Sequence, residues 1–474
     1  MTERIPKRVL IAVVAVCLPL LAYLAGIRPG YFTSPDYLAR VLLFEFLLVA
    51  LWLYRSIFFP LIVVTFLLAG TSLPVGGIWV AVRWFFLCAG AFLGSFIMLK
   101  ERRHHFGLFH ALAVFAVLAG LASAFVSRYP KFALLKAISL LALFVYAGTG
   151  ARLAVTGREN RFFNGLLTGC ELFVAGIAAL YFLGIEAMGN PNSLGAVMGV
   201  VGAPVLLWGT MLDDEPWVLL RRKILSAVAI YLTFQSHSRA GLAGAIISCG
   251  LLCLALRRYK LLGQGIILTL ILVAGSAIVN PEAFSRNASS LSSTVVYKGK
   301  DPRLGVFASR RTPWQGALET IRNHFWLGTG FGTTDNGQDA SAHLSAFSTV
   351  EGVTAENGSS YLAITTWVGM LGVVPFLFLL LVLLNRVLRT VFWMLNTGNP
   401  SHPAIPLAMV MVAGLVHAGF EDWLFAVGYY LCVFFWSLAF ILVDVAPYAR
   451  LPQLSVKWRP KPVRPHWGGV APSP

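Results

Sequence analysis

Long runs of apolar residues, separated by short polar segments, follow one another along almost the whole chain of 474 residues. A run of about 17–25 apolar residues is long enough to cross a bilayer as an α-helix. About fourteen windows meet this condition: roughly 9–26, 38–54, 57–72, 78–99, 109–127, 132–149, 162–184, 192–212, 217–236, 239–256, 261–279, 359–385, 404–420 and 424–445. The pattern therefore predicts an all-α polytopic membrane protein with about 14 transmembrane helices.

The composition agrees with this reading and excludes several other classes of protein. Hydrophobic residues make up 58% of the chain and charged residues only 12%, whereas a soluble domain carries about 25% charged residues. An intrinsically disordered chain and a secreted disulfide scaffold are excluded on the same ground. The six cysteines all lie in apolar runs, so neither a disulfide framework nor a metal site is predicted from them.

The net charge of +17 comes from 37 Lys and Arg against 20 Asp and Glu. In a membrane protein such an excess marks cytoplasmic loops rather than a nucleic-acid surface. Placing the N-terminus inside puts most of the basic loops on the cytoplasmic face, so both termini are predicted to be cytoplasmic. The Pro-rich basic tail 446–474 is then expected to lie near anionic lipid.

One connection is too long for a simple helical bundle. Residues 280–358 form a predicted periplasmic loop, while most other loops are short. Long loops in compact proteins are usually functional. The chain thus divides into transmembrane helices 1–11 (residues 1–279), the large loop (280–358), transmembrane helices 12–14 (359–445) and the cytoplasmic tail (446–474).

The large loop contains a segment with helical character. Thr312 is a candidate N-cap, Pro313 suits the first helical position, and Gln315 completes a Thr-x-x-Gln capping box. Apolar residues follow at helical spacing, and the glycines of 328–332 are expected to end the helix. The pattern predicts one amphipathic helix over 312–324, lying across the outer mouth of the bundle.

Arg239 is the first candidate for chemistry. It lies between two predicted spans that are each slightly shorter than the hydrocarbon core, so it is expected to be recessed in a polar pocket with Ser236 and His237. The alternative is a loop arginine that only fixes topology. A recessed arginine is costly without a partner, and phosphate is the natural partner for its two-pronged guanidinium.

Arg310 and Arg311 form a second candidate phosphate site, because they lie at the entrance of the predicted loop helix. Loop arginines are also commonly solvated, and both interpretations stay open. Glu356 lies just before a predicted span of 27 residues, at the rim of the pocket, where partial burial can make a carboxylate a useful base. Its alternative role is that of a carboxylate at a helix N-terminus.

Three further polar residues are candidates for substrate contacts. Asn190 and Asn192, in the turn GNPNSLG, could contact sugar hydroxyls, but capping the following helix is the favoured interpretation. Glu421, in the last predicted outer loop, could pair with one of the arginines.

Several motifs together resemble the O-antigen ligase and polysaccharide polymerase superfamily of bacterial inner membranes. They are SHSRAG (236–241), R-x-x-W-x-x-A (311–317) with GTGFG (328–332), SYL (360–362) with WVGMLG (367–372), and FEDW (420–423). The resemblance covers about 185–445 and rests on their order and placement around one long outer loop. It implies a multi-helix lipid-dependent glycosyltransferase that transfers glycans from undecaprenyl diphosphate on the periplasmic face, without a cofactor or a required metal.

The resemblance also implies roles for the candidate residues. Arg239, with Arg310 or Arg311, would hold the donor diphosphate, and Glu356 would accept a proton from the acceptor hydroxyl. Ligases of this family typically carry a His-Asn pair directly before Ser-Tyr-Leu, whereas this chain has Gly358 and Ser359 there. This departure favours a polymerase of exopolysaccharide or O-antigen repeats over a ligase that transfers glycan to lipid A core or protein.

The implied partners are the undecaprenyl-diphosphate-linked glycan, membrane lipids, a flippase and chain-length or export proteins, with no nucleic acid. A rival class remains open: a transporter or flippase of lipid-linked glycans, whose intramembrane charges would line a transport path. A non-catalytic assembly subunit is the third possibility.

Overall fold

The computed structural model describes residues 47–71, 76–101, 106–185, 187–188, 190–212, 215–265, 308–333 and 357–447, with the single residues 26 and 267. These residues form helices, and within them no β-strand is present apart from one isolated bridge between Thr71 and Met188. The all-α prediction is confirmed for this part of the chain. The first predicted span (9–26), residues 38–46 and most of 261–279 lie outside the described residues.

The helices have the following bounds: η1 (Arg55–Ile57), α4 (Phe58–Ala69), α5 (Gly76–Glu101), α6 (Leu108–Ala124), α7 (Pro130–Tyr146), η2 (Ala147–Ala151), α8 (Arg152–Val155), α9 (Glu159–Phe182), α10 (Pro191–Val197), η3 (Met198–Gly202), α11 (Ala203–Gly209), α12 (Pro216–Gln235), α13 (Arg239–Ala255), α16 (Ala308–Asn323), α17 (Ser360–Thr397), α18 (Ala404–Ala418) and α19 (Tyr430–Val445). Each predicted span from 57–72 to 239–256, and from 359–385 to 424–445, overlaps one of these helices or a continuous series of them. The described end of the span 38–54 is the helix Leu47–Leu53.

Length and composition support a membrane location. Five helices of the described chain are long and apolar enough to cross a bilayer, or six if the bent pair Leu47–Leu53 and Arg55–Ala69 is one span. Four more apolar helices are shorter: α6, α13, α18 and α19. The number of fourteen spans stays a prediction, as does the periplasmic placement of the loop.

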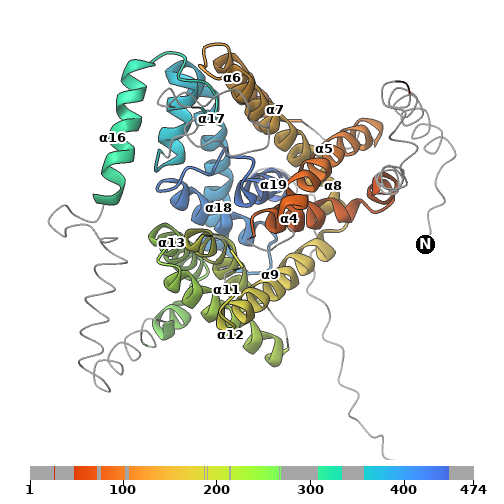
Figure 1. Ribbon diagram of the computed structural model, residues 1–474. Helices are drawn as coiled ribbons and strands as arrows, with labels where there is room; N and C mark the ends of the chain where they lie inside the picture. The colour runs from red at the N-terminus through yellow and green to blue at the C-terminus, as the bar shows by residue number, and fades with distance from the viewer. Residues whose placement is uncertain are drawn as a thin grey trace, which may run out of the picture.

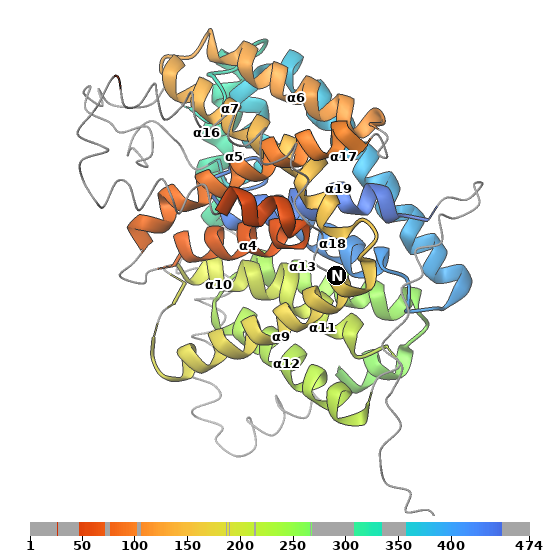
Figure 2. The ribbon, with the colours of Figure 1, turned by 90° about the vertical axis from the view of Figure 1, so that its right-hand side faces the viewer.

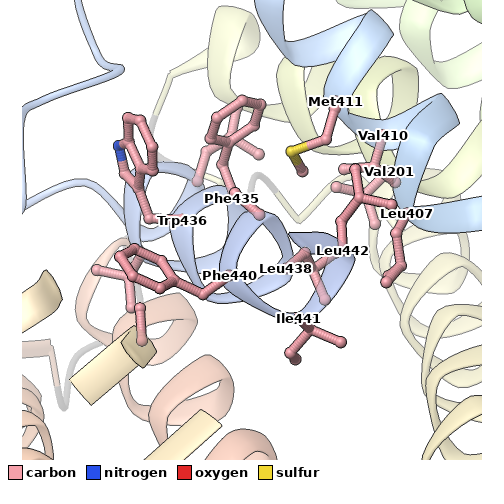
Figure 3. Close-up of a cluster of buried hydrophobic side chains, with 14 of the residues drawn as sticks. Val201, Leu407, Val410, Met411, Phe435, Trp436, Leu438, Phe440, Ile441 and Leu442 are labelled. Carbon is pink, nitrogen blue, oxygen red and sulfur yellow. The ribbon is translucent and has the colours of Figure 1, made fainter. Parts of the chain in front are cut away.

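The hydrophobic core lies around α18 and α19. In Figures 1 and 2 these two helices occupy the centre, with α5, α6 and α7 on one side and α9, α11, α12 and α13 on the other. Figure 3 shows aromatic and aliphatic side chains that radiate from α19 and meet α18 and η3. Phe435, Trp436 and Leu438 of α19 are buried together with Met411 of α18. The other helices of the bundle therefore pack around α18 and α19.

Two sets of charged side chains inside the bundle form ion pairs. Glu171 of α9 is buried and accepts hydrogen bonds from Arg221 at 2.5 Å and Arg222 at 2.8 Å, both on α12. Arg152 of α8 donates to Asp444 near the end of α19, at 2.5 and 2.9 Å. Since an unpaired charge in a membrane interior is expensive, these pairs fix how α9, α12, α8 and α19 meet.

The helix after the large loop is longer than the predicted window and is kinked. The predicted span 359–385 is part of α17, which continues to Thr397, and Gly369 interrupts it with φ of +68°. At this kink the Met370 amide donates to the Phe325 carbonyl oxygen at 2.8 Å, and the Gly330 amide donates to the Trp367 carbonyl oxygen at 3.0 Å. A Cβ atom at Gly369 would lie 2.4 Å from a backbone atom of Trp326, so only glycine fits. The backbones of the WVGMLG and GTGFG motifs are thus in direct contact with each other.

The loop helix α16 corrects one prediction. It begins at Ala308, four residues before the predicted N-cap, so that Thr312 and Pro313 lie inside the helix and the capping box around Gln315 does not start it. The additional turn contains Arg310, whose side chain is engaged by a distant part of the chain, as described below. Tertiary contact therefore extends the helix past the local capping signal. In Figure 1, α16 stands at the periphery of the bundle beside α17.

Candidate active site

An ion pair joins the loop helix to the turn before α19. The Arg310 guanidinium of α16 donates to the Glu421 carboxylate, and the two side chains are only 10% and 20% exposed. Glu421 was predicted to pair with one of the arginines, and its partner is Arg310. The neighbouring Arg311 is exposed.

The beginning of α17 holds the turn that carries Glu421. The Ser360 hydroxyl donates to the Glu421 carbonyl oxygen at 2.6 Å and accepts from the Leu424 amide at 3.0 Å. The Asn357 amide donates to the Asp422 carboxylate at 3.0 Å. The SYL and FEDW motifs, about sixty residues apart in sequence, are therefore joined by hydrogen bonds into one corner, made of residues 357–360 and 421–424. The Glu421 carboxylate in this corner contacts α16.

The same corner also receives the loop helix. The Trp314 indole N–H donates to the Gly358 carbonyl oxygen at 3.1 Å. Gly358 has φ of +65°, and a Cβ atom there would lie 3.3 Å from Pro313 and 3.4 Å from Arg310. The position where ligases of the resembled superfamily carry a histidine is thus a glycine packed against α16. A side chain at this position would be strained and crowded.

Arg239 begins α13 and belongs to the same charged group. It is half-buried and interacts electrostatically with both Arg310 and Glu421. Ser238 caps the helix by accepting a hydrogen bond from the Gly241 amide at 3.2 Å. His237, in the turn between α12 and α13, has a left-handed backbone conformation with φ of +54°. The structure therefore pairs Arg310 with Glu421, and Arg239 at the start of α13 lies within range of the charges of both.

Close backbone contacts fix the turn that carries Arg239. A Cβ atom at Gly195 of α10 would lie 2.2 Å from the Ser236 hydroxyl oxygen, and one at Gly199 of η3 would lie 2.3 Å from the Gly241 carbonyl oxygen. The Ser236 hydroxyl itself donates to the Thr233 carbonyl oxygen at 2.7 Å and is buried. Ser236 thus has a structural contact that positions the arginine turn.

The predicted asparagines lie at the start of α10. The Asn190 side-chain oxygen accepts a hydrogen bond from the Asn192 amide at 2.8 Å, which is the capping interaction. In the same turn of α10, Ser193 accepts hydrogen bonds from Tyr429 at 3.4 Å through its hydroxyl and from Tyr430 at 3.1 Å through its carbonyl oxygen. The start of α10 is therefore connected to the turn that carries Glu421.

A buried histidine of this site was not among the predicted site residues. His417, at the end of α18, is 2% exposed, and its Nδ1 accepts a hydrogen bond from the Trp423 indole N–H at 2.7 Å. Since an indole nitrogen only donates, the neutral imidazole carries its proton on Nε2. Nε2 has no hydrogen-bond partner in the part of the chain that the structure describes. The spacing of His417 and Trp423 within HAGFEDW was the available signal, but a His-Trp pair has no general meaning in sequence.

The predicted base, Glu356, lies outside the described residues. So do Asp339 and His343, two residues of the predicted large loop that are the next candidates for the base. The first described residue after Glu356, Asn357, is anchored to Asp422. Among the residues that the structure describes, no group of three or more His, Cys, Asp or Glu side chains could hold a metal ion.

A comparison with protein families agrees with this geometry. Apolar helices indicate a membrane protein, and residues 224–377 match the family described as O-antigen ligase. This segment is about a third of the chain, and its match confirms the predicted resemblance to the O-antigen ligase and polymerase superfamily. The matched segment includes Arg239, Arg310 and Gly358 but not Glu421. No curated protein matches the chain.

Proposed function

We propose that the protein is a polymerase that joins lipid-linked oligosaccharide repeat units on the periplasmic face of the bacterial inner membrane. The observation that carries the proposal is the ion pair of Arg310 and Glu421, with Arg239 within electrostatic range of both, in a chain whose residues 224–377 match the O-antigen ligase family. Two arginines near one anionic group suit the two phosphates of a diphosphate, because guanidinium binds phosphate oxygens in pairs.

In this proposal the Glu421 carboxylate pairs with Arg310 as long as no donor is bound. The diphosphate of the undecaprenyl-linked donor takes over Arg310 and engages Arg239 at the same time. Both arginines then stabilise the negative charge that develops on the leaving group as the glycosidic bond breaks. No metal is needed for this role, since two guanidinium groups already supply positive charge.

The bond that forms and the bond that breaks follow from this arrangement. The hydroxyl oxygen of the acceptor sugar attacks the anomeric carbon of the donor glycan, and the bond from that carbon to the diphosphate oxygen breaks with inversion. Undecaprenyl diphosphate leaves, and the hydroxyl proton passes to a carboxylate. We assign this base role to Glu356, next to the anchored Asn357, with Glu421 as the second candidate once the donor releases it from Arg310.

Gly358 favours a polymerase over a ligase. The position that carries a histidine in ligases is occupied here by a glycine whose backbone and neighbours leave little room for a larger side chain. Transfer to a different acceptor, such as lipid A core or a protein, is the alternative within the same superfamily, because the matched family is described as O-antigen ligase.

Reconstitution of the purified full-length protein in liposomes tests the proposal. Lipid-linked repeat units alone should be converted into longer lipid-linked chains, with release of undecaprenyl diphosphate. Glycan that appears on lipid A core or protein only when that acceptor is added would instead indicate a ligase. Movement of the lipid-linked glycan between leaflets without a new glycosidic bond would identify a carrier and contradict the proposal.

A further inference from the structure

A crevice on the side of the bundle has no part in the candidate active site. It lies between α4, α9 and α19, with η3 in its wall, and has a volume of about 510 Å³. Ligand sites usually have volumes of roughly 300–1,000 Å³. Its walls are mainly aliphatic and aromatic side chains. The crevice is therefore large enough for a ligand and suited to an apolar one.

Two glycines of α9 keep the crevice open. Gly165 and Gly169 line it, and a Cβ atom at either position would meet no other atom within 4 Å. Because they are one helical turn apart, they lie on the same side of α9. Larger side chains at these positions would fill space that the fold leaves empty.

Basic side chains stand at one end of the crevice only. Arg158 and Arg161, at the beginning of α9, line it there together with Ser56, and both arginines are exposed. This is the end of the bundle that the distribution of Lys and Arg predicts to be cytoplasmic. Tyr430 and Leu67 line the other end. The crevice thus combines a cationic end with an apolar interior.

The length of the crevice matches one leaflet of a membrane. Along α4 it extends from Ser56 to Leu67, which is about 16 Å at a rise of about 1.5 Å per residue. A single leaflet contributes about half of the hydrocarbon core of roughly 30 Å. An acyl chain that enters beside Arg158 and Arg161 would therefore extend along the crevice toward Leu67 and Tyr430.

We propose that this crevice binds an anionic phospholipid of the cytoplasmic leaflet, with the phosphate at Arg158 and Arg161 and an acyl chain along Gly165 and Gly169. Charge complementarity selects this occupant, because basic pockets between helices on the cytoplasmic side attract anionic headgroups. The donor lipid fits less well, since its diphosphate is assigned to Arg239 and Arg310 and not to this end of α9. The site does not depend on the proposed glycosyl transfer.

Native mass spectrometry of the full-length protein in detergent tests this site without any glycan. The protein is mixed with phosphatidylglycerol or with phosphatidylcholine of the same acyl chains. We expect one phosphatidylglycerol to be retained preferentially. Each arginine near an anionic headgroup strengthens lipid attraction, so the double variant Arg158→Gln/Arg161→Gln should lower that preference by about ten- to thirtyfold.

The glycines supply a matched pair of variants. Gly165→Leu/Gly169→Leu should abolish retention of both lipids, whereas Gly176→Leu should bind as the parent does. Gly176 is on the same helix with equally open surroundings, but it does not line the crevice. If the double leucine variant fails to fold, the arginine variant carries the test, because its side chains are exposed.

Four results would overturn the proposal. The first is that the double leucine variant retains phosphatidylglycerol as the parent does, and the second is that the parent retains both lipids equally. The third is that one equivalent of undecaprenyl diphosphate displaces phosphatidylglycerol. The fourth is that the parent forms a dimer which the double leucine variant loses. The third result would assign the crevice to the donor chain, and the fourth to a second copy of the protein.

Discussion

Arg310 of α16 and Glu421 of the turn before α19 form an ion pair across 111 residues of sequence. Both side chains are largely buried, so the pair is shielded from water on most sides. The loop helix is therefore held against the bundle through Arg310, the side chain that receives the donor diphosphate in the proposed mechanism. Binding of the donor and release of Glu421 would then be one event.

Replacing Glu421 tests this exchange. In Glu421→Gln the donor no longer competes with a carboxylate for Arg310. This competition is worth at least about 1 kcal/mol, because an exposed ion pair contributes up to that much and this pair is largely buried. We expect the lipid-linked donor to bind at least about fivefold more tightly, as measured by titration in nanodiscs. Glu319→Gln, an exposed carboxylate on the same helix, is the control and should bind as the parent does. Weaker donor binding in Glu421→Gln would mean that Glu421 contacts the substrate directly.

The second prediction concerns the base. Glu356→Gln keeps the shape of the side chain and removes its basicity, so it should bind the donor normally and elongate it about a hundred- to ten-thousandfold more slowly. Losing only a helix-end charge would cost about 0.3–1 kcal/mol of stability and leave the rate nearly unchanged. Single-turnover elongation separates the two roles. If Glu356→Gln polymerises at the parental rate, Glu421 becomes the leading candidate for the base, followed by His343 and Asp339.

Gly358 should be intolerant of any side chain. Its φ of +65° and the contacts with Pro313 and Arg310 predict that Gly358→Ala destabilises the docking of α16 by about 1–3 kcal/mol. Limited proteolysis should then cleave α16 faster than in the parent. Gly250→Ala serves as the control, because Gly250 is in helix α13 with nothing within 4 Å of an added Cβ atom. Equal cleavage of the Gly358→Ala variant and the parent would show that α16 docks independently of this corner.

Orientation in the membrane can be measured directly. Reporter fusions should place residue 320 outside and residues 104, 218, 395 and 465 inside, as the distribution of Lys and Arg predicts. An even number of crossings between residues 218 and 320 would contradict the proposed topology. The candidate active site would then face the cytoplasm, and the donor would have to reach it from that side.

The apolar runs predicted where the helices lie, because a helix that crosses a bilayer needs a continuous apolar stretch of a fixed length, and such stretches can be recognised in the sequence. They did not predict the kink at Gly369 or the early start of α16. Both depend on contacts between distant segments: residues 325–330 with α17, and Arg310 with Glu421. A local capping signal such as Thr312 and Gln315 carries no information about such partners.

For the candidate site, too, the sequence predicted some residues, while others required the fold. Residue type and position along the chain identified Arg239, between two short spans, and Arg310, at the start of the predicted loop helix, because charges near a membrane are costly. The choice between Arg310 and Arg311, adjacent in sequence, required the fold, because only Arg310 meets Glu421. His417 was missed because a single histidine at the end of an apolar helix is unremarkable until its hydrogen bond to Trp423 is seen.

The central claim is that Arg239 and Arg310 hold a diphosphate, and substitution of Arg239 tests it most directly. Elongation of lipid-linked repeat units by purified protein in liposomes should fall by at least about a hundredfold in Arg239→Ala. Arg239→Lys should recover little, because an ammonium cannot bind two phosphate oxygens in parallel. Arg322→Ala, an exposed arginine at the end of α16, should elongate at the parental rate. Parental turnover in Arg239→Ala, with the protein inserted and folded, would contradict the account.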